Sequence, residues 1–256
     1  MARVIAIVNQ KGGVGKTTTS VNLGAYLAQQ GKFVLLVDLD PQANATSGLG
    51  VDHKNVANGL YEALSGKINL REVVQATNHD GYRLVPATAA LAGANIELVG
   101  VEDREHYLAK LLDEVRGQYD FILIDCPPSL GLLTVNALVA ADEVLIPVQA
   151  EYFALEGLGQ LFETINLVKE NLKPSLSILG AVITMFDSRN KLSEAVMTEL
   201  YKFFPNKIFR SVIPRNVRLA EAPSHGKSIL TYDRGSKGAT AYERLAKELI
   251  EYNSGS

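Results

Sequence analysis

The stretch Lys11-Gly12-Gly13-Val14-Gly15-Lys16-Thr17-Thr18 decides the fold of this chain. Its glycines lack Cβ atoms, so the backbone can adopt positive φ angles and direct several N–H groups into one anion-sized hollow. In such a loop Lys16 supplies a positive charge for the β- and γ-phosphates of a nucleotide, and the Thr17 hydroxyl is placed to ligate Mg²⁺. We therefore predict that this stretch binds a nucleoside triphosphate.

The entrance of the loop departs from the usual pattern. Glycine is expected at position 10, where this chain has Gln10, and a second lysine, Lys11, follows it. Lys11 stands five residues before Lys16, at the mouth of the loop. From there it can point away from its own nucleotide and towards that of a partner.

The segments on both sides of the loop support the prediction. Residues 4–8 form a short, uncharged apolar run, as expected of a buried parallel strand. Residues 17–30 have the pattern of a helix that Gly31 ends. A strand, a glycine loop and a helix N-terminus in this order make an anion-binding site.

Length and composition are those of a folded domain. The chain has 256 residues, of which 47% are apolar and 21% charged, and we predict one domain over residues 1–252 with a flexible tail at 253–256. No apolar run approaches the roughly 20 residues of a membrane span, and no secretory leader precedes the first strand. The one cysteine, Cys126, rules out an internal disulfide. These features predict a cytoplasmic protein without membrane attachment.

Strand-like apolar runs alternate with helical segments along the chain. The alternation predicts an α/β fold, with a mostly parallel, twisted sheet and helices on both faces. The predicted strands are residues 4–8, 33–37, 82–85, 121–124, 143–148, 177–184 and 208–212. The predicted helices are residues 17–30, 58–64, 89–99, 104–116, 130–140, 155–171, 191–204 and 238–252. Ligands of such sheets bind at the carboxyl ends of the strands, where the motifs of this chain fall.

Two aspartates follow the second predicted strand. Asp38 and Asp40 leave the sheet at the edge that carries the phosphate loop, and Pro41 prevents further ladder pairing. We interpret Asp40 as the residue that positions the attacking water, and Asp38 as a residue that shapes the metal site. The alternative is that both are polar strand-end residues that cap a turn.

A third aspartate, Asp125, follows the strand at 121–124 and is placed to contact Mg²⁺ through water. The next residues, Cys126-Pro127-Pro128-Ser129-Leu130-Gly131, are stiffened by two prolines. We predict that they form a switch segment that a triphosphate orders. Cys126 is interpreted as a packing residue and not as a nucleophile, because no histidine lies near it in sequence.

The loop after the last predicted strand reads Val212-Ile213-Pro214-Arg215-Asn216-Val217-Arg218. In a nucleoside triphosphatase of this shape, the loop at this place usually holds the base. Pro214 can pack on a ring face and Asn216 can pair with its edge, while Thr184-Met185-Phe186 completes the pocket. The alternative is an ordinary surface loop.

Charge is unevenly distributed along the chain. The net charge is −3, so the chain as a whole is not a basic nucleic-acid binder. Residues 187–237, however, carry ten Lys and Arg against five Asp and Glu. Either these cations are merely solvated, or some of them bind DNA. The unexplained cations are Arg189, Lys191, Arg215, Arg218, Lys227, Arg234 and Lys237.

Several motifs together carry a family resemblance. The loop at 11–18, Asp38-Leu39-Asp40-Pro41-Gln42 and Asp125-Cys126-Pro127-Pro128-Ser129 resemble the P-loop ATPases with a deviant phosphate loop. Within that family, which includes MinD, the likeness is to the chromosomal ParA/Soj type and runs from residue 3 to about residue 249. It rests on Asn44-Ala45-Thr46-Ser47-Gly48-Leu49-Gly50, Pro147-Val148-Gln149-Ala150-Glu151-Tyr152 and Val212-Ile213-Pro214-Arg215-Asn216-Val217-Arg218-Leu219-Ala220-Glu221-Ala222-Pro223-Ser224.

The resemblance implies an ATP-dependent homodimer that segregates chromosomes or plasmids. Two protomers sandwich two ATP molecules, and Lys11 reaches across to the phosphates of the other subunit. Lys16 and Thr17 keep their phosphate and Mg²⁺ roles, and Asp40 matches the hydrolysis residue. Pro214 and Asn216 match the base contacts.

The resemblance also implies partners. The dimer binds DNA of the nucleoid without sequence preference, and Arg189 and Arg218 match positions associated with that patch. A ParB-type, centromere-bound protein stimulates a slow hydrolysis, after which the dimer leaves the DNA.

Four other functions agree less well with the sequence. MinD-like ATPases attach to membranes through a basic amphipathic C-terminal helix, whereas the last predicted helix here mixes acids and bases. Nitrogenase iron proteins need paired cysteine ligands, and this chain has one cysteine. An amidoligase would need a substrate pocket beside the γ-phosphate, for which no separate set of residues stands out. A nucleotide-gated module with negligible turnover is disfavoured by Asp40.

Overall fold

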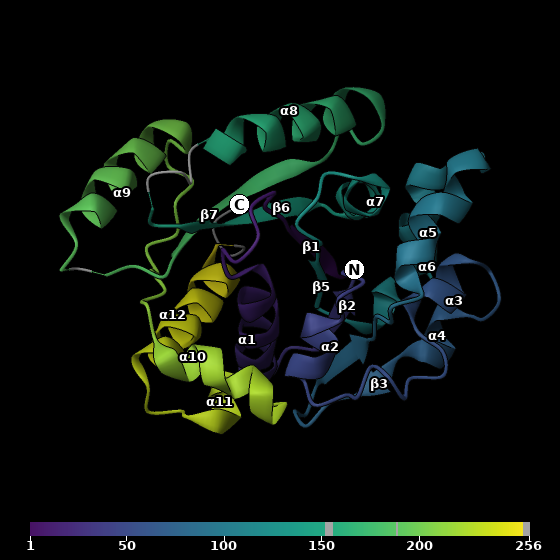
Figure 1. The fold of residues 1–256 in the computed structure, drawn as a ribbon, viewed down its shortest axis with the longest axis horizontal. Helices are drawn as coiled ribbons and strands as arrows, with labels where there is room; N and C mark the ends of the chain where they lie inside the picture. The colour runs from purple at the N-terminus through teal and green to yellow at the C-terminus, as the bar shows by residue number, and fades with distance from the viewer. Residues whose placement is uncertain (152–155, 188, 253–256) are drawn as a thin grey trace.

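The computed structural model describes residues 1–151, 156–187 and 189–252. Its centre is a seven-stranded sheet in the order β3-β4-β2-β5-β1-β6-β7 (Figure 1). Every pairing in this sheet is parallel except that of β3 with β4. The strands are β1 (Arg3–Ile7), β2 (Val34–Asp38), β3 (Gln75–Ala76), β4 (Tyr82–Val85), β5 (Phe121–Asp125), β6 (Glu143–Gln149) and β7 (Ser177–Thr184). The predicted α/β fold is confirmed, and the short antiparallel edge strand β3 was not predicted.

The predicted strand at 208–212 is wrong. This segment makes one isolated bridge with β7, at Ala181 with Ile208, and forms no continuous ladder; a second bridge, Phe186 with Pro214, lies just beyond both segments. The physical reason lies in its middle, where the backbone N–H groups of Arg210 and Ser211 donate to the carboxylate of Glu248 instead, at 2.7 and 3.0 Å. The segment therefore stays beside β7 at its two ends, where the Phe209 N–H donates to Ala181 and the Ile213 N–H to Ile183, and contacts the last helix in between.

Most predicted helices are present with shifted ends. The α-helices are α1 (Lys16–Gln29), α2 (Asn44–Gly48), α3 (Leu60–Leu64), α4 (Leu70–Val73), α5 (Leu91–Glu97), α6 (Tyr107–Asp113), α7 (Leu132–Ala140), α8 (Glu156–Asn171), α9 (Lys191–Phe203), α10 (Val217–Glu221), α11 (Ile229–Tyr232) and α12 (Lys237–Glu251). The short helices α2, α4, α10 and α11 were not predicted.

Two predicted helices end earlier than expected because local geometry changes to 3₁₀ turns. The helix at 89–99 is α5 followed by a 3₁₀ turn at Leu98–Gly100. The helix at 104–116 is α6 between two such turns, Arg104–His106 and Arg116–Gln118. The predicted first residue of α8 and the predicted tail at 253–256 lie outside the described residues.

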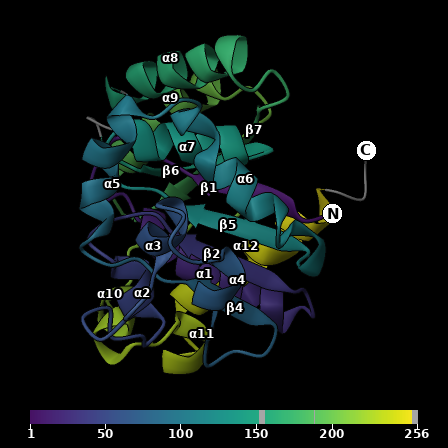
Figure 2. The same cartoon turned by 90° about the vertical axis from the view of Figure 1, so that its right-hand side faces the viewer.

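Helices cover both faces of the sheet, as Figures 1 and 2 show from two directions. On one face, β1 residues such as Val4 and Ala6 pack with the apolar sides of α3 to α9. On the other face, Ile5 and Ile7 pack with α1, α2 and α10 to α12. Successive strand residues point to opposite faces, so the continuous apolar runs of the sequence are explained by burial on both sides. None of the helices in the described ranges has the length and apolar character that crossing a membrane requires.

Helix α1 is seated on the sheet by a close fit between Gly24 and Tyr82. A Cβ atom at Gly24 would lie 2.2 Å from the Tyr82 hydroxyl oxygen. The hydroxyl donates a hydrogen bond to the carbonyl of Ser20, at 3.1 Å. A glycine in a helix interior costs about 1 kcal/mol relative to alanine, and here it allows a buried tyrosine from β4 to hold the helix that follows the phosphate loop.

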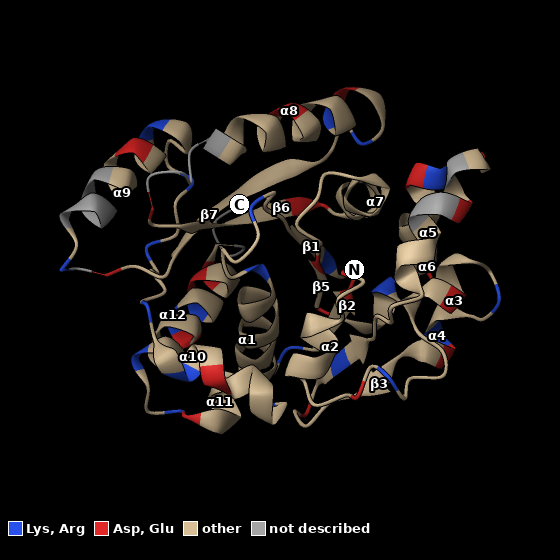
Figure 3. Cartoon of the chain, viewed as in Figure 1, with Lys and Arg blue, Asp and Glu red and all other residues tan. Residues whose placement is uncertain are grey.

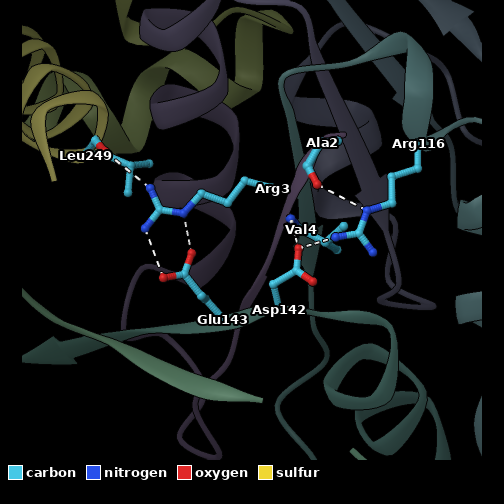
Figure 4. Close-up of polar contacts among 7 residues, drawn as sticks. All are labelled: Ala2, Arg3, Val4, Arg116, Asp142, Glu143 and Leu249. Atoms are coloured by element: carbon cyan, nitrogen blue, oxygen red, sulfur yellow. Dashed lines mark hydrogen bonds and ion pairs between the residues drawn. The ribbon is translucent and has the colours of Figure 1, made fainter. Parts of the chain in front are cut away.

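The amino end of the sheet is fastened by two ion pairs (Figure 4). Arg3, at the start of β1, pairs with Glu143 of β6 and donates to the Leu249 carbonyl of α12. Asp142 pairs with Arg116, at 2.5 Å, and also accepts from the backbone N–H of Val4. This cluster sits at the end of the strands away from the phosphate loop, so we assign it to stability.

Candidate functional site

The glycine loop lies between β1 and α1, with its backbone bent into the left-handed region. Gly13 and Gly15 have φ of 74° and 89°, which L-residues with a Cβ rarely adopt. Gly12 has no positive φ in this structure. The loop is tied to the end of β7, because the Thr184 hydroxyl donates to the Val14 carbonyl at 2.8 Å. It is tied to the entrance as well, since Asn9 Oδ1 accepts from the Lys11 N–H at 3.0 Å.

Lys16 is buried beneath the loop. Its Nζ donates to the Lys11 carbonyl at 3.1 Å, which holds the ammonium group across the loop. Burial lowers the pKa of Lys16, while the carboxylate of Asp125 raises it. A buried cation next to a cradle of backbone N–H groups attracts a polyphosphate strongly, because little water screens the charges.

Thr17 and Asp125 meet at the start of α1. The Thr17 hydroxyl donates to Asp125 Oδ2 and the Ser20 hydroxyl to Oδ1, both at 2.8 Å. Burial raises the pKa of Asp125 to about 6. A hydroxyl beside a buried carboxylate at the mouth of a phosphate loop is the oxygen donor set that Mg²⁺ prefers. These residues therefore fit the predicted metal site, in which Thr17 ligates Mg²⁺ and Asp125 contacts it through water.

Asp38 is paired in register with Asp125 and is fully buried. Its Oδ2 accepts from both the N–H and the hydroxyl of Thr46, at 2.8 and 2.7 Å. Burial, and then the neighbouring Asp125, raise the pKa of Asp38 to about 7. Asp38 thus anchors α2 beside the metal site. Asp40 accepts from the Gln42 N–H at 2.9 Å and faces the open space in front of the loop.

A cavity of about 590 Å³ opens in front of the loop and α1. Its walls come from the loop, the start of α1, Asp40, α2, Pro128 of the predicted switch segment and the segment after α10. The lining residues are Gly12, Gly13, Gly15, Lys16, Thr17, Thr18, Val21, Asn22, Asp40, Gln42, Asn44, Ser47, Gly48, Pro128, Met185, Pro223, Ser224 and Lys227. The structure therefore brings Lys16, Thr17 and Asp40 to one cavity, whereas Asp125 is buried behind Thr17 and does not line it.

A second cavity of about 420 Å³ adjoins the first and shares Gly15, Thr18 and Met185 with it. It is mostly apolar and is lined further by Thr184, Ile213, Pro214, Arg215, Asn216, Val217, Leu219, Ala220 and Tyr242. Pro214 and Asn216 thus stand where a base would lie if its phosphates occupied the loop. Asn216 Oδ1 also accepts from the Arg218 N–H at 2.8 Å and so caps α10.

Lys11 lines neither cavity. Its Nζ lies 3.9 Å from Glu151 Oε2, and the Arg215 guanidinium lies 3.4 Å from the other oxygen of that carboxylate, Oε1. The Lys11 side chain is 36% exposed, so an ion pair of this length contributes little to stability and is easily exchanged. Lys11 is directed away from its own loop interior and remains free to contact another group.

The two arginines predicted to bind DNA each have a partner in the chain. Arg189 makes two side-chain hydrogen bonds to Asp187, at 2.7 and 2.9 Å, and its side chain is 88% exposed. Arg218 lies between Glu221 and Asp233, at 3.0 and 3.4 Å. The side chain of Lys191 lies outside the described part of the structure.

Sequence reasoning missed several residues that shape the site. Ser47 of α2 and Ser224 and Lys227 after α10 line the first cavity, and Thr46 of α2 holds the buried carboxylate of Asp38. Asn9 holds the loop entrance. The available signal was the placement of small polar residues directly after strands that end at one edge of the sheet. Cys126 is buried, and burial raises the pKa of its thiol, as expected of a packing residue.

The parallel sheet, the glycine loop before α1 and the buried Lys16 define a P-loop nucleoside triphosphatase. Residues 2–178 match the model of the AAA domain family. The chain is 55% identical to the sporulation initiation inhibitor protein Soj of Bacillus subtilis (strain 168), over 97% of this chain and 98% of that protein. It is 52% identical to the chromosome-partitioning ATPase Soj of Treponema pallidum (strain Nichols), over 98% of each chain.

Solved structures show the same fold. Cobyrinic acid a,c-diamide synthase from Mycobacterium smegmatis with bound ADP and magnesium aligns with a TM-score of 0.88 at 38% identity, over 100% of this chain and 96% of that one. The same protein is known with a bound ATP analog and magnesium. On the identity to the Soj and ParA proteins over nearly its full length, this chain belongs to the Soj/ParA family of chromosome-partitioning ATPases.

Proposed function

We propose that this protein is an ATP-dependent dimerisation switch that binds DNA without sequence preference and drives the segregation of a chromosome or plasmid. One observation carries the proposal: the two lysines of the loop are separated, with Lys16 lining the nucleotide cavity and Lys11 outside it. A lysine that lies near a triphosphate but does not turn back on its own loop is best neutralised by the phosphates of a second nucleotide site. Two copies that exchange this contact form an isologous interface with nucleotide at its core.

The roles of the chain's own residues follow from their positions. The loop N–H groups and Lys16 bind the β- and γ-phosphates, and Pro214 and Asn216 hold the base. Thr17 ligates Mg²⁺ and Asp125 contacts it through water. When bound there, Mg²⁺ neutralises charge that develops on the phosphates during transfer.

Asp40 is the residue we assign to hydrolysis. It lies at the open side of the first cavity and is nearly buried, with 7% of its surface exposed. From there its carboxylate orients a water molecule for attack on the γ-phosphate. With no second base assigned beside it, turnover is slow until a partner completes the site. The partner we propose is a ParB-type protein bound at the centromere.

DNA binding follows from dimerisation. Each protomer contributes a modest number of cations, among them Arg189 and Arg218, and a dimer doubles the phosphate contacts. Each phosphate neutralised adds about 0.9 to the salt slope of the affinity. The protein therefore binds DNA when it holds ATP and releases DNA after hydrolysis. It is cytoplasmic and associated with the nucleoid.

A diamide synthase activity is the second candidate, because a solved structure of that name aligns over the whole chain. Its identity of 38% is lower than the 55% shared with the Soj protein. The first cavity is lined by the phosphate loop, Thr17 and Asp40, which are the residues that a nucleotide and its hydrolysis require. Glutamine-dependent amidation of a carboxylate by the purified protein would support the synthase instead.

The deciding experiment is size-exclusion chromatography with light scattering. The protein is run alone, with ADP and with a non-hydrolysable ATP analogue, each with and without random-sequence DNA. We expect monomers without nucleotide and with ADP, dimers with the analogue, and DNA bound by the dimer only. A monomer in every condition would refute the switch.

Variants separate the assigned roles. Lys11→Ala is expected to abolish the ATP-dependent dimer and to keep nucleotide binding, whereas Lys16→Ala loses both. Asp40→Ala is expected to trap a DNA-bound dimer, and wild-type turnover in this variant would remove its assigned role. Arg218→Glu is expected to weaken DNA binding with dimerisation intact.

A further inference from the structure

A third concave region lies between α12 and the segment before α10. Its volume is about 600 Å³, and it is lined by Phe186, Arg210, Ser211, Val212, Pro214, Lys237, Thr240, Ala241 and Arg244. Three of these residues are cations and none is an acid. We call the exposed side chains of Arg210, Lys237, Thr240 and Arg244 the α12 basic surface. In Figure 3, α12 and the segments before it carry blue basic residues with red acidic residues between them.

Helical spacing places the surface on one side of α12. Lys237, Thr240 and Arg244 are three and seven residues apart along the helix, so they share a face. The opposite face is apolar and packs into the core through Tyr242, Leu245 and other buried residues. Lys237 is the first residue of this 15-residue helix, whose first turn contains no acidic residue. The partial positive charge of the helix N-terminus therefore adds to the charge of the side chains.

Two carboxylates of α12, those of Glu243 and Glu248, are already engaged. Glu248 accepts from the backbone N–H groups of Arg210 and Ser211 and from the Ser211 hydroxyl. Glu243 pairs with Lys247 at 2.7 Å. Glu248 also explains why Arg210 belongs to the surface, because its carboxylate holds the Arg210 segment against α12.

The cations of the α12 basic surface differ from Arg189 and Arg218 in whether they have a carboxylate partner. Within the described residues, the side chains of Arg210, Lys237 and Arg244 form no hydrogen bond or ion pair. Arg189 and Arg218, in contrast, are held by carboxylates. A phosphate that approaches a paired arginine also meets the partner's negative charge, whereas the lining of the α12 basic surface holds three cations and no acid.

We propose that the α12 basic surface binds the phosphate backbone of duplex DNA and is a principal part of the DNA interface. This inference rests on the proposed DNA-binding function and assigns its contact residues. Lys237 and Arg244 are separated by about 10 Å along the helix at 1.5 Å per residue, a spacing that suits a row of phosphates better than one small anion. The surface has no exposed bulky apolar side chain to insert into a lipid bilayer, which favours nucleic acid over a membrane.

The test is a variant with Arg210→Gln, Lys237→Gln and Arg244→Gln, assayed as the full chain with the ATP analogue. All three side chains are exposed, so the variant is expected to fold and to dimerise as the wild type does. Its affinity for random-sequence duplex is expected to fall at least 10-fold in moderate salt, and the salt slope to drop by about 2 to 3 per protomer. The matched control is Arg83→Gln, Lys169→Gln and Lys173→Gln, which removes the same charge elsewhere and is expected to change affinity less than 3-fold.

The outcomes separate this inference from the proposed function. If the wild type binds DNA and the triple variant binds with equal affinity and equal salt slope, the inference is overturned and the function stands. If the wild type binds no DNA in any nucleotide state, the proposed function fails first. If the wild type binds phosphatidylglycerol vesicles, and the triple variant loses this binding but keeps its DNA binding, the surface is a membrane contact and the inference is overturned.

Discussion

Substituting Gly24 by alanine tests whether the fit between α1 and Tyr82 holds the nucleotide site in place. The added Cβ would lie 2.2 Å from the Tyr82 hydroxyl oxygen and 2.3 Å from Cζ, so the buried ring must move. Overpacking of this kind costs about 1–3 kcal/mol, and loss of the hydrogen bond to Ser20 costs about 1 kcal/mol. Alanine returns about 1 kcal/mol through helix propensity. The net expectation, near the upper end because the overlap is severe, is about 3 kcal/mol.

The assay is urea unfolding of the nucleotide-free protein, with thermal melting as a second measurement. A loss of about 3 kcal/mol lowers Tm by about 6–10 °C in a chain of this size. The matched control is Gly159→Ala, in the interior of α8, where no atom lies within 4 Å of an added Cβ; it is expected to be neutral or slightly stabilising. In a Tyr82→Leu background, which lacks the clashing ring atoms, Gly24→Ala is expected to lose its penalty. An equal penalty in both backgrounds would refute the steric reasoning.

Three further predictions concern charge, glycine and the amino end of the sheet. The pKa of Asp38 is raised to about 7, so between about pH 4 and 7 the folded chain keeps a proton that the unfolded chain has lost. In Mg²⁺-free buffer, the free energy of unfolding relative to Asp38→Asn is therefore expected to fall as pH rises through this window, by up to about 1.4 kcal/mol per pH unit. A rise of this free energy with pH in urea titrations would contradict the prediction. Gly226→Ala is expected to lose about 2–4 kcal/mol and to weaken nucleotide binding, because its φ is 61° and its Cβ would lie 2.7 Å from Gly50 Cα. The control Gly66→Ala has a similar φ of 71° and no neighbour within 4 Å, so it is expected to lose only about 1 kcal/mol; equal losses in thermal melts would exclude a packing role. Arg3→Ala removes a largely buried ion pair at the start of β1 and is expected to cost about 2 kcal/mol with unchanged nucleotide affinity, since the pair is far from the loop; a weakened affinity by calorimetry would show otherwise.

The sequence was most informative where local chemistry is sufficient. The loop at 11–18 needs glycines to bend and a lysine to hold phosphate, and both requirements are visible as residue types at fixed spacing. The strand ends at Asp38 and Asp125 were also predicted from residue types, because an acid that follows an apolar run marks the edge of a parallel sheet. Six residues of the loop line one cavity together with Asp40, while Asp38 and Asp125 are buried at the ends of neighbouring strands.

The errors arose where a contact from far along the chain decides local structure. Residues 208–212 have strand-like composition, yet Glu248, 37 residues beyond Ser211, takes the backbone N–H groups that a ladder would use. Helix α2 is short and has no strong helical pattern, and it is held by the hydrogen bonds of Thr46 to Asp38. The α12 basic surface could not be predicted either, because composition does not show which cations have carboxylate partners.

The hydrogen bond from Thr184 to the Val14 carbonyl has a consequence for how the nucleotide is released. The same strand end continues into Phe186, whose backbone exchanges hydrogen bonds with Ile213 and Arg215 beside the base cavity. The phosphate loop and the base cavity are thus connected through three consecutive residues, 184–186, and a displacement of one strains the other. An intact nucleotide should consequently gain far more affinity than adenosine and triphosphate do separately, and its departure should be all-or-none.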